Sequence, residues 1–274
     1  MAKLRIQWIE SFDAPELQPY ATMKRPLEHH QQGIFVAEGI KVARRLIESH
    51  FAVISAVVPE KWLAEFQPLL EARPEPEIPV YLADKKLLET LVGFSMFQGV
   101  MAVGRIPAPE SLDSILSKSP SPRLLVAIDA LTNAENLGTL VRNCVGLNVQ
   151  ALIVGETCAS PFIRRSVRSS MGTIFQLPVA AVQHLAQSLR ELRRLGVHCV
   201  AAHPPADPLT LARADFRRDC CLVFGSEGAG IRPEVLDACD VAVAIPMAQS
   251  VDSLNVGSAA AVFLYEANRQ RGRM

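Results

Sequence analysis

The chain has 274 residues, of which 49% are hydrophobic and 20% are charged. This balance is typical of packed globular proteins and excludes an intrinsically disordered chain, and the length allows two domains. The formal net charge of +0 argues against non-specific binding of polyanions through overall charge.

The first residues lack the apolar run of a signal peptide, and no charge-free stretch has the length of a membrane-spanning helix. We therefore expect a cytoplasmic protein that does not bind a membrane. The six cysteines have no C-x-x-C spacing, so no zinc site is expected. Several of them interrupt apolar runs, as small buried side chains do.

Residues 1–105 have the pattern of a small α/β domain. Helices and strands are predicted in alternation at 38–48 (helix), 52–58 (strand), from Pro59 (helix), 80–82 (strand), 85–92 (helix) and 100–103 (strand). Residues 106–122 contain four prolines among serines, which predicts a linker, although Leu112, Ile115 and Leu116 allow a short helix within it. The remaining residues, 123–274, are then expected to fold separately.

In residues 123–274, continuous apolar runs alternate with helical patterns. Strands are predicted at 124–128, 151–154, 197–202, 221–224 and 241–245. Helices are predicted at 137–147, 161–170, 185–195, 233–239 and 256–269. Apolar strands between helices indicate a parallel sheet covered by helices on both faces.

In an open parallel sheet, ligands bind in loops at the carboxyl ends of the strands. Three such loops carry glycine and polar residues: one after Ile128, one reading Gly225-Ser226-Glu227-Gly228-Ala229-Gly230, and one from Ile245 to Asn255. The glycines let a ligand approach the backbone, so a side chain at Gly225 is expected to occupy ligand space. Because G-x-x-G-x-G is not the dinucleotide fingerprint, a nucleotide-binding oxidoreductase is not favoured.

The three loops contain N-x-G-x-x-x-R (136–142), G-S-E-G-x-G (225–230) and I-P-M…S-L-N-V (245–256), in this order. Together they resemble the SpoU family of RNA ribose methyltransferases, also called the TrmH family. The stretch F-V-A-E-G-I-K at 35–41 is similar to the ribosomal-protein-like RNA-binding domain of many members. The resemblance therefore implies a substrate-RNA-binding domain at 1–105, a linker at 106–122 and a methyltransferase domain at 123–274.

The resemblance implies a SPOUT fold, in which a trefoil knot of the C-terminal domain binds S-adenosylmethionine. It also implies a homodimer whose site is completed across the interface, and a reaction that needs no metal. The residues that would contact the cofactor, largely through backbone groups, are Gly225, Ile245 and Leu254. Those that would surround the reacting ribose 2′-hydroxyl are Asn136, Arg142, Glu227, Ser253 and Asn255.

A guanidinium stays protonated in proteins, so we expect Arg142 to position the substrate and stabilise a developing alkoxide. Whether Arg142, a phosphate or water removes the proton remains open. Three residues depart from the family pattern: the pair Asn133-Ala134 stands where aspartate-proline is common, and Gln249 stands where glycine is common.

Structured RNA is the expected partner, and the N-terminal domain favours ribosomal RNA over transfer RNA. The cluster Arg164, Arg165 and Arg168 is a candidate for phosphate contacts, whereas arginines at 190–194 alternate with leucines as in an ordinary amphipathic helix. The alternatives are the same chemistry on transfer RNA and a catalytically silent RNA-binding protein.

Overall fold

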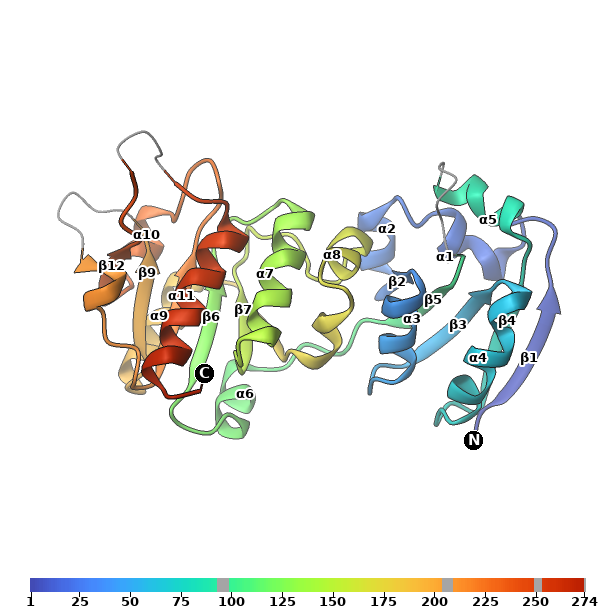
Figure 1. Ribbon diagram of the computed structural model, residues 1–274, viewed down its shortest axis with the longest axis horizontal. Coiled ribbons are helices and arrows are strands. Elements are labelled where there is room, and N and C mark those ends of the chain that lie inside the picture. Colours follow the sequence, from blue (N-terminus) through green and yellow to red (C-terminus); the bar gives the residue numbers. More distant parts are fainter. Residues whose placement is uncertain (93–98, 204–208, 249–252, 274) are drawn as a thin grey trace. The chain divides into compact units, whose positions relative to one another are not determined.

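The computed structural model describes residues 1–92, 99–203, 209–248 and 253–273. The chain forms two compact units (Figure 1). Unit 1 comprises residues 1–108 and 162–175, and unit 2 comprises residues 109–161 and 176–274. Within the described ranges, no helix is both long and apolar enough to cross a membrane.

Unit 1 is built on a five-stranded mixed sheet with the order β1-β4-β3-β5-β2. Strand β4 pairs in parallel with β1 and β3, whereas β5 is antiparallel to β3 and β2. Its elements are β1 (Lys3–Trp8), η1 (Pro15–Leu17), α1 (Gln18–Ala21), α2 (Pro26–Gln31), β2 (Ile34–Glu38), α3 (Ile40–Ile47), β3 (Val53–Val58), α4 (Glu60–Glu71), β4 (Glu77–Leu82), α5 (Lys85–Val92), β5 (Met101–Arg105) and α8 (Arg164–Ser169). The short helix η2 (Thr173–Gln176) lies where the chain passes from unit 1 to unit 2.

The sequence missed two strands of unit 1. Both strands carry a signal that the prediction did not use: β1 reads K-L-R-I-Q-W, which alternates polar and apolar residues although most of them are exposed at the sheet edge, and β2 is a short apolar run that is buried at every position. The helix predicted from residue 38 was wrong at its start, because Glu38 ends β2. Gly39, with a φ of +99°, makes the turn into α3, a conformation that favours glycine.

The segment 162–175 was expected in the second domain, but it packs within unit 1. The ring centroids of Phe162 and Phe175 lie 6.0 and 5.4 Å, respectively, from the ring centroid of Phe35. The buried carboxylate of Glu38 pairs with Arg164, and also with Arg168 at 3.2 Å. Sequence periodicity shows that α8 buries one face but not which element covers it. The compact units therefore differ from the predicted domains at this segment, and the roles assigned to the domains stay predictions.

The predicted linker 106–122 is also partly structured, since it contains α6 (Leu112–Lys118). Ile115 and Leu116 of this helix are buried in the core of unit 2. The connection between the last strand of unit 1 and the first helix of unit 2 is therefore only residues 106–111.

Unit 2 contains a seven-stranded sheet, β10-β12-β9-β11-β6-β7-β8, in which every neighbouring pair is parallel. Its further elements are β6 (Leu124–Ile128), α7 (Ala134–Gly146), β7 (Ala151–Val154), β8 (Val179–Ala181), α9 (Leu185–Arg194), β9 (His198–Ala202), β10 (Leu209–Thr210), η3 (Leu211–Arg213), β11 (Cys220–Phe224), α10 (Pro233–Leu236), β12 (Val241–Ala244) and α11 (Val256–Gln270). The parallel α/β fold is confirmed. The knot stays a prediction.

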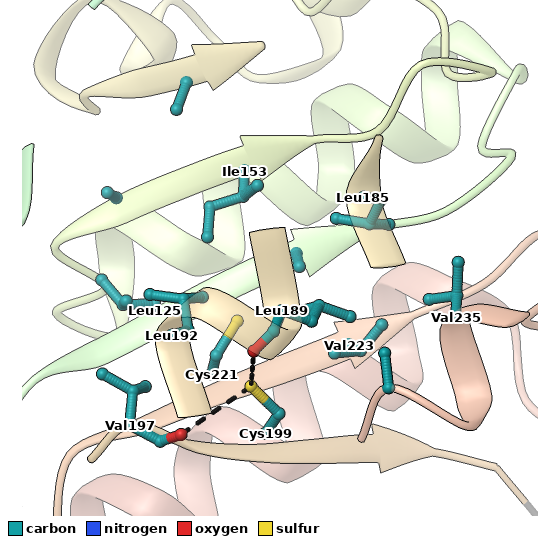
Figure 2. Close-up of a cluster of buried hydrophobic side chains, with 14 of the residues drawn as sticks. Leu125, Ile153, Leu185, Leu189, Leu192, Val197, Cys199, Cys221, Val223 and Val235 are labelled. Carbon is teal, nitrogen blue, oxygen red and sulfur yellow. Dashed lines mark hydrogen bonds between the residues drawn. The ribbon is translucent and has the colours of Figure 1, made fainter. Parts of the chain in front are cut away.

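Helices cover both faces of this sheet. On one face, α6, α9 and α10 bury apolar side chains against the central strands, and Figure 2 shows Leu185, Leu189 and Leu192 of α9 in this core. Their spacing confirms the amphipathic interpretation of the helix that carries Arg190 and Arg193. On the other face, the ring of Phe263 of α11 packs edge-on against the ring of Phe224 of β11, with 5.7 Å between the ring centroids.

Candidate functional site

The three loops selected from the sequence emerge at one edge of the unit 2 sheet. They follow β6, β11 and β12. Strands β6 and β11 are neighbours in the sheet, and only β9 lies between β11 and β12. Because all these strands are parallel, their carboxyl ends share an edge. The sheet thus brings the three loops close together, although they are spread along the sequence from residue 129 to residue 255.

A chain of side-chain hydrogen bonds joins these loops. The Asn136 Nδ2 group, at the start of α7, donates to the Glu227 carboxylate in the glycine loop. Asn255 Nδ2 donates to Asn136 Oδ1 at 2.9 Å, and Asn255 Oδ1 accepts from the Gly257 N–H at 2.9 Å. Three of the five predicted catalytic residues therefore meet through direct contacts.

The start of α7 is fixed by Asn133, one of the residues that depart from the family pattern. Its side-chain oxygen accepts from the backbone N–H groups of Glu135 at 3.0 Å and Asn136 at 3.1 Å. Asparagine is a favoured N-cap, so the departure at Asn133-Ala134 keeps the helix start capped. The other departure, Gln249, lies outside the described residues.

The glycine loop closes on itself. Ser226 and Gly230 exchange backbone hydrogen bonds of 3.0 Å in each direction, and Gly230 has a φ of +70°. A Cβ atom at Gly225 would lie 2.2 Å from the carbonyl carbon of Gly230, far inside van der Waals contact. Glycine at 225 is therefore required for loop closure itself, in addition to any space that a ligand needs.

The remaining predicted residues do not join this network through any hydrogen bond that the structure describes. Ile245 follows β12 and is half-buried, whereas Ser253 and Leu254 are exposed directly before α11. Arg142 is exposed on α7 and makes no hydrogen bond or ion pair with any residue the structure describes. The side chains of Arg142 and Ser253 are therefore not brought into the Asn136 network.

Sequence reasoning missed an ion-pair network at the same edge. Asp129, directly after β6, is fully buried and accepts two hydrogen bonds from Arg232. Arg232 also donates to Glu156, which follows β7, at 2.7 Å. The available signal was a carboxylate shortly after each of two buried strands, together with an arginine just past the glycine loop.

These contacts set the charge of the network. Partial burial acts to raise the pKa of Glu156, but hydrogen bonds from its own backbone, Arg232 and Leu185 outweigh it and lower the pKa. The hydrogen bond to Glu156, assisted by Asp129, raises the pKa of Arg232 further above its ordinary range. Arg232 thus stays protonated at the exit of the glycine loop.

Four of the cysteines are buried and two are half-buried. Burial raises the pKa of the Cys220 thiol to about 11, so this thiol is protonated at neutral pH. In the ranges that the structure describes, no three histidine, cysteine, aspartate or glutamate side chains gather as metal ligands.

The fold and loops define an open parallel α/β protein whose three motif loops gather at the carboxyl edge of its sheet. The chain belongs to the SpoU rRNA Methylase family, whose model matches residues 123–265. An uncharacterized tRNA/rRNA methyltransferase of Mycobacterium tuberculosis is 32% identical, covering 97% of this chain and 93% of that protein.

Two further relatives carry more specific names. The 23S rRNA (guanosine-2′-O-)-methyltransferase RlmB of Ralstonia nicotianae is 34% identical, covering 75% of this chain and 82% of that protein. The SpoU methyltransferase AviRb of Streptomyces viridochromogenes, solved in complex with the cofactor AdoMet, superposes with a TM-score of 0.81 at 28% identity. That match covers 94% of this chain and 98% of AviRb.

Proposed function

We propose that this protein transfers a methyl group from S-adenosylmethionine to a ribose 2′-hydroxyl of RNA, with ribosomal RNA as its substrate. The observation that carries the proposal is the Asn136–Glu227–Asn255 network, which joins the three family motifs at the ligand edge of the sheet. Family membership supports the methyl transfer, and the RlmB relative supports the 2′-hydroxyl and ribosomal RNA.

The loops fit S-adenosylmethionine as a largely backbone-lined cradle. The glycine loop offers main-chain groups without side chains at Gly225, Gly228 and Gly230, and Ile245 and Leu254 add apolar surface. When bound, the cofactor supplies an electrophilic methyl group on its sulfonium. The part of this chain is to hold the acceptor oxygen in line with that group.

The network fixes the orientation of the Asn136 amide. Its nitrogen is engaged by Glu227 and its oxygen by Asn255, so the amide cannot flip without losing both contacts. The nitrogen keeps a second N–H for the RNA. Arg142, permanently charged, stabilises negative charge on the ribose oxygen as the proton leaves to phosphate or water.

Two copies of the chain are proposed to complete each site. Asn136 and Arg142 lie six residues apart on α7, roughly 240° around the helix, so they face different directions. Val262 and Tyr265 are exposed on one face of α11 and offer an apolar surface for a second copy. Arg142 of one protomer would then serve the Asn136 network of its partner.

Mixing two inactive variants tests this arrangement. If Arg142 acts across the interface, an equimolar exchange of Arg142→Ala and Asn136→Ala protomers restores about a quarter of wild-type activity, because half of the dimers carry one intact site. If Arg142 acts within its own protomer, mixing restores nothing. Light scattering at micromolar concentration measures the dimer directly.

Two measurements test the proposed activity. Calorimetry with S-adenosylmethionine separates it from a catalytically silent RNA-binding protein, which has no need to bind the cofactor. Mapping of ribose methylation in total RNA, from cells with and without this protein, then identifies the substrate. A missing mark on ribosomal RNA supports the proposal, whereas a missing mark on transfer RNA alone overturns the choice of substrate.

A further inference from the structure

We propose that Arg232 is a positioning residue that holds the glycine loop in its cofactor-binding conformation through Asp129 and Glu156. The inference rests on the proposed function, because it assumes that the loop binds S-adenosylmethionine. It assigns a role to three residues that lie outside the family motifs identified in the sequence.

Arg232 is held by Asp129 at two points. Its backbone N–H donates to Asp129 Oδ2 and its Nε donates to Asp129 Oδ1, both at 2.8 Å. The carboxylate is fully buried directly after β6, so it is a fixed anchor rather than a mobile surface charge. Because one bond is to the main chain, the anchor constrains the path of the backbone itself.

The other end of the Arg232 guanidinium extends the anchor to the next strand. Its Nη2 donates to Glu156 Oε1 at 2.7 Å, and Glu156 Oε2 accepts the Leu185 N–H at the start of α9 at 2.9 Å. Glu234 lies 3.2 Å from the remaining guanidinium nitrogen. Arg232 therefore ties the segment after the glycine loop to the ends of β6 and β7.

Arg232 lies only two residues after Gly230, the last residue of the glycine loop. Gly230 closes the loop against Ser226, and Ile231, which follows it, is buried in the core. At its other end the loop continues directly from β11. The loop is thus clamped by β11 on one side and by Arg232 on the other. A substitution of Arg232 removes the side-chain bonds and leaves only the main-chain bond to Asp129, so we expect Gly230 to move away from Gly225.

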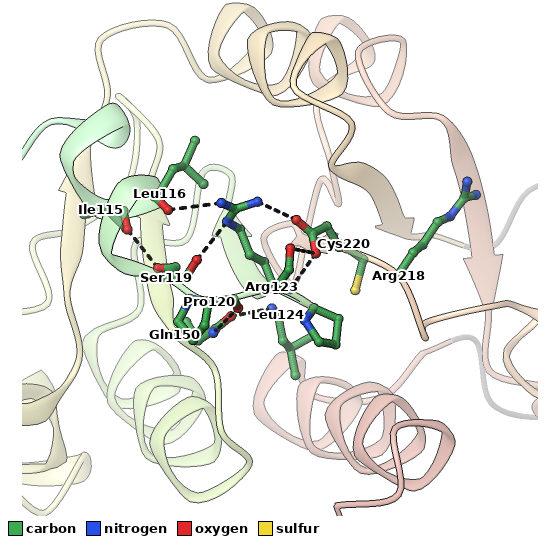
Figure 3. A network of polar contacts seen from close by, with 12 residues as sticks. Ile115, Leu116, Ser119, Pro120, Arg123, Leu124, Gln150, Arg218 and Cys220 are labelled. Atoms are coloured by element: carbon green, nitrogen blue, oxygen red, sulfur yellow. Dashed lines mark hydrogen bonds and ion pairs between the residues drawn. The ribbon is translucent and has the colours of Figure 1, made fainter.

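The competing interpretation is that these charges stabilise unit 2 without influencing the loop. The chain offers a matched control at the opposite, amino-terminal edge of the same sheet (Figure 3). There Asp219 accepts from the Arg123 backbone N–H at 2.8 Å and from its guanidinium at 2.6 Å, the same two-point arrangement. The side chains of Arg123 and Arg232 are 27% and 26% exposed.

The experiment compares Arg232→Gln with Arg123→Gln in the full-length protein, by calorimetry with S-adenosylmethionine, by thermal melting and by steady-state methylation. We expect Arg232→Gln to weaken cofactor affinity about tenfold or more and to raise the KM for the cofactor, with kcat at saturation within about threefold. Arg123→Gln should lower the melting temperature comparably and leave affinity within about twofold.

Arg232→Lys provides a variant that retains the positive charge. A lysine ammonium can reach one carboxylate but cannot form the bidentate contacts of the guanidinium. The variant should fold and show an intermediate loss of affinity. Cofactor binding unchanged in both Arg232 variants, or weakened equally by Arg123→Gln, overturns the positioning role alone. A wild-type protein that does not bind S-adenosylmethionine overturns the proposed function as well.

Discussion

The side chain of Asn255 donates to Asn136 Oδ1 at 2.9 Å while its own oxygen accepts the Gly257 N–H at the start of α11. One residue therefore caps a helix and also completes the polar network that joins the motif loops. The cap uses the oxygen of the amide and the network uses the nitrogen, so a substitution that keeps only the oxygen separates the two roles.

Asn255→Asp is that substitution. The carboxylate still accepts the Gly257 N–H, so stability should change by less than about 0.5 kcal/mol. It cannot donate to Asn136, and its charge lies near Glu227, so methyl transfer should fall about 100-fold through misplacement of the substrate. Asn255→Ala should additionally cost about 1 kcal/mol in urea unfolding. Wild-type activity in Asn255→Asp would remove the network from the mechanism.

Gly225 and Gly228 form a matched pair within one loop. A Cβ atom at 225 lies 2.2 Å from the Gly230 backbone, whereas a Cβ atom at 228 meets nothing within 4 Å. Gly225→Ala should therefore open the loop and weaken S-adenosylmethionine binding by about tenfold or more, while Gly228→Ala stays within about twofold. Calorimetry on both variants decides; equal affinities would show that loop closure does not shape the cofactor site.

The sequence predicted the elements whose burial leaves a strong pattern. Strands β6, β7, β9, β11 and β12 are apolar runs, and the prediction placed each within about a residue. Such runs are typical of parallel strands in the middle of a sheet, although β12 is itself only partly buried. Strand β8 has three residues and β10 only two, too short for a periodic signal.

Long-range relationships were beyond the sequence. Asp129 and Arg232 are 103 positions apart. The sequence contains many charged residues, and it does not show which arginine or lysine pairs with a given aspartate. The same holds for Glu38 and Arg164, 126 positions apart, which assign the segment 162–175 to unit 1. A motif selects loop residues, but only packing shows that Arg142 stays outside their network.

Arg164 is expected to stabilise unit 1 rather than to contact phosphate. Its side chain is 14% exposed against a Glu38 carboxylate that is 3% exposed, and Arg168 is the second cation on that carboxylate. Arg164→Met should lower the free energy of unfolding by about 3 kcal/mol, because it leaves a buried charge poorly compensated. Arg165→Met, at an exposed position, should change it by less than about 0.5 kcal/mol. Similar urea midpoints would contradict this assignment.

Acidification should destabilise both units through histidines. Burial is the main cause that lowers the pKa of His29 and of His198, with Arg164 and Arg218 adding to the effect. The unfolded chain binds protons below about pH 6.5 while the folded histidines stay neutral, so stability falls as pH drops from there toward the folded pKa values. Urea midpoints should decrease over this window and flatten in the His29→Gln, His198→Gln double variant. An unchanged slope would assign the pH dependence elsewhere.

A protein truncated to residues 109–274 should retain the cofactor site and lose solubility. The network residues Asn136, Glu227 and Asn255 all belong to unit 2. The segment 162–175, however, loses the aromatic contacts that Phe35 and Phe51 provide.

The truncated chain is therefore expected to aggregate and to bind a hydrophobic dye, since it exposes Phe162, Ile174 and Phe175, all buried in the full-length protein. Adding Phe162→Ser and Phe175→Ser should restore a monodisperse protein whose affinity for S-adenosylmethionine stays within about threefold of the full-length value. Its RNA affinity should fall and depend less on salt, because unit 1 is proposed to supply phosphate contacts. Full RNA affinity in the truncated protein would place docking in unit 2, and a soluble chain without the serine substitutions would show that 162–175 does not need unit 1.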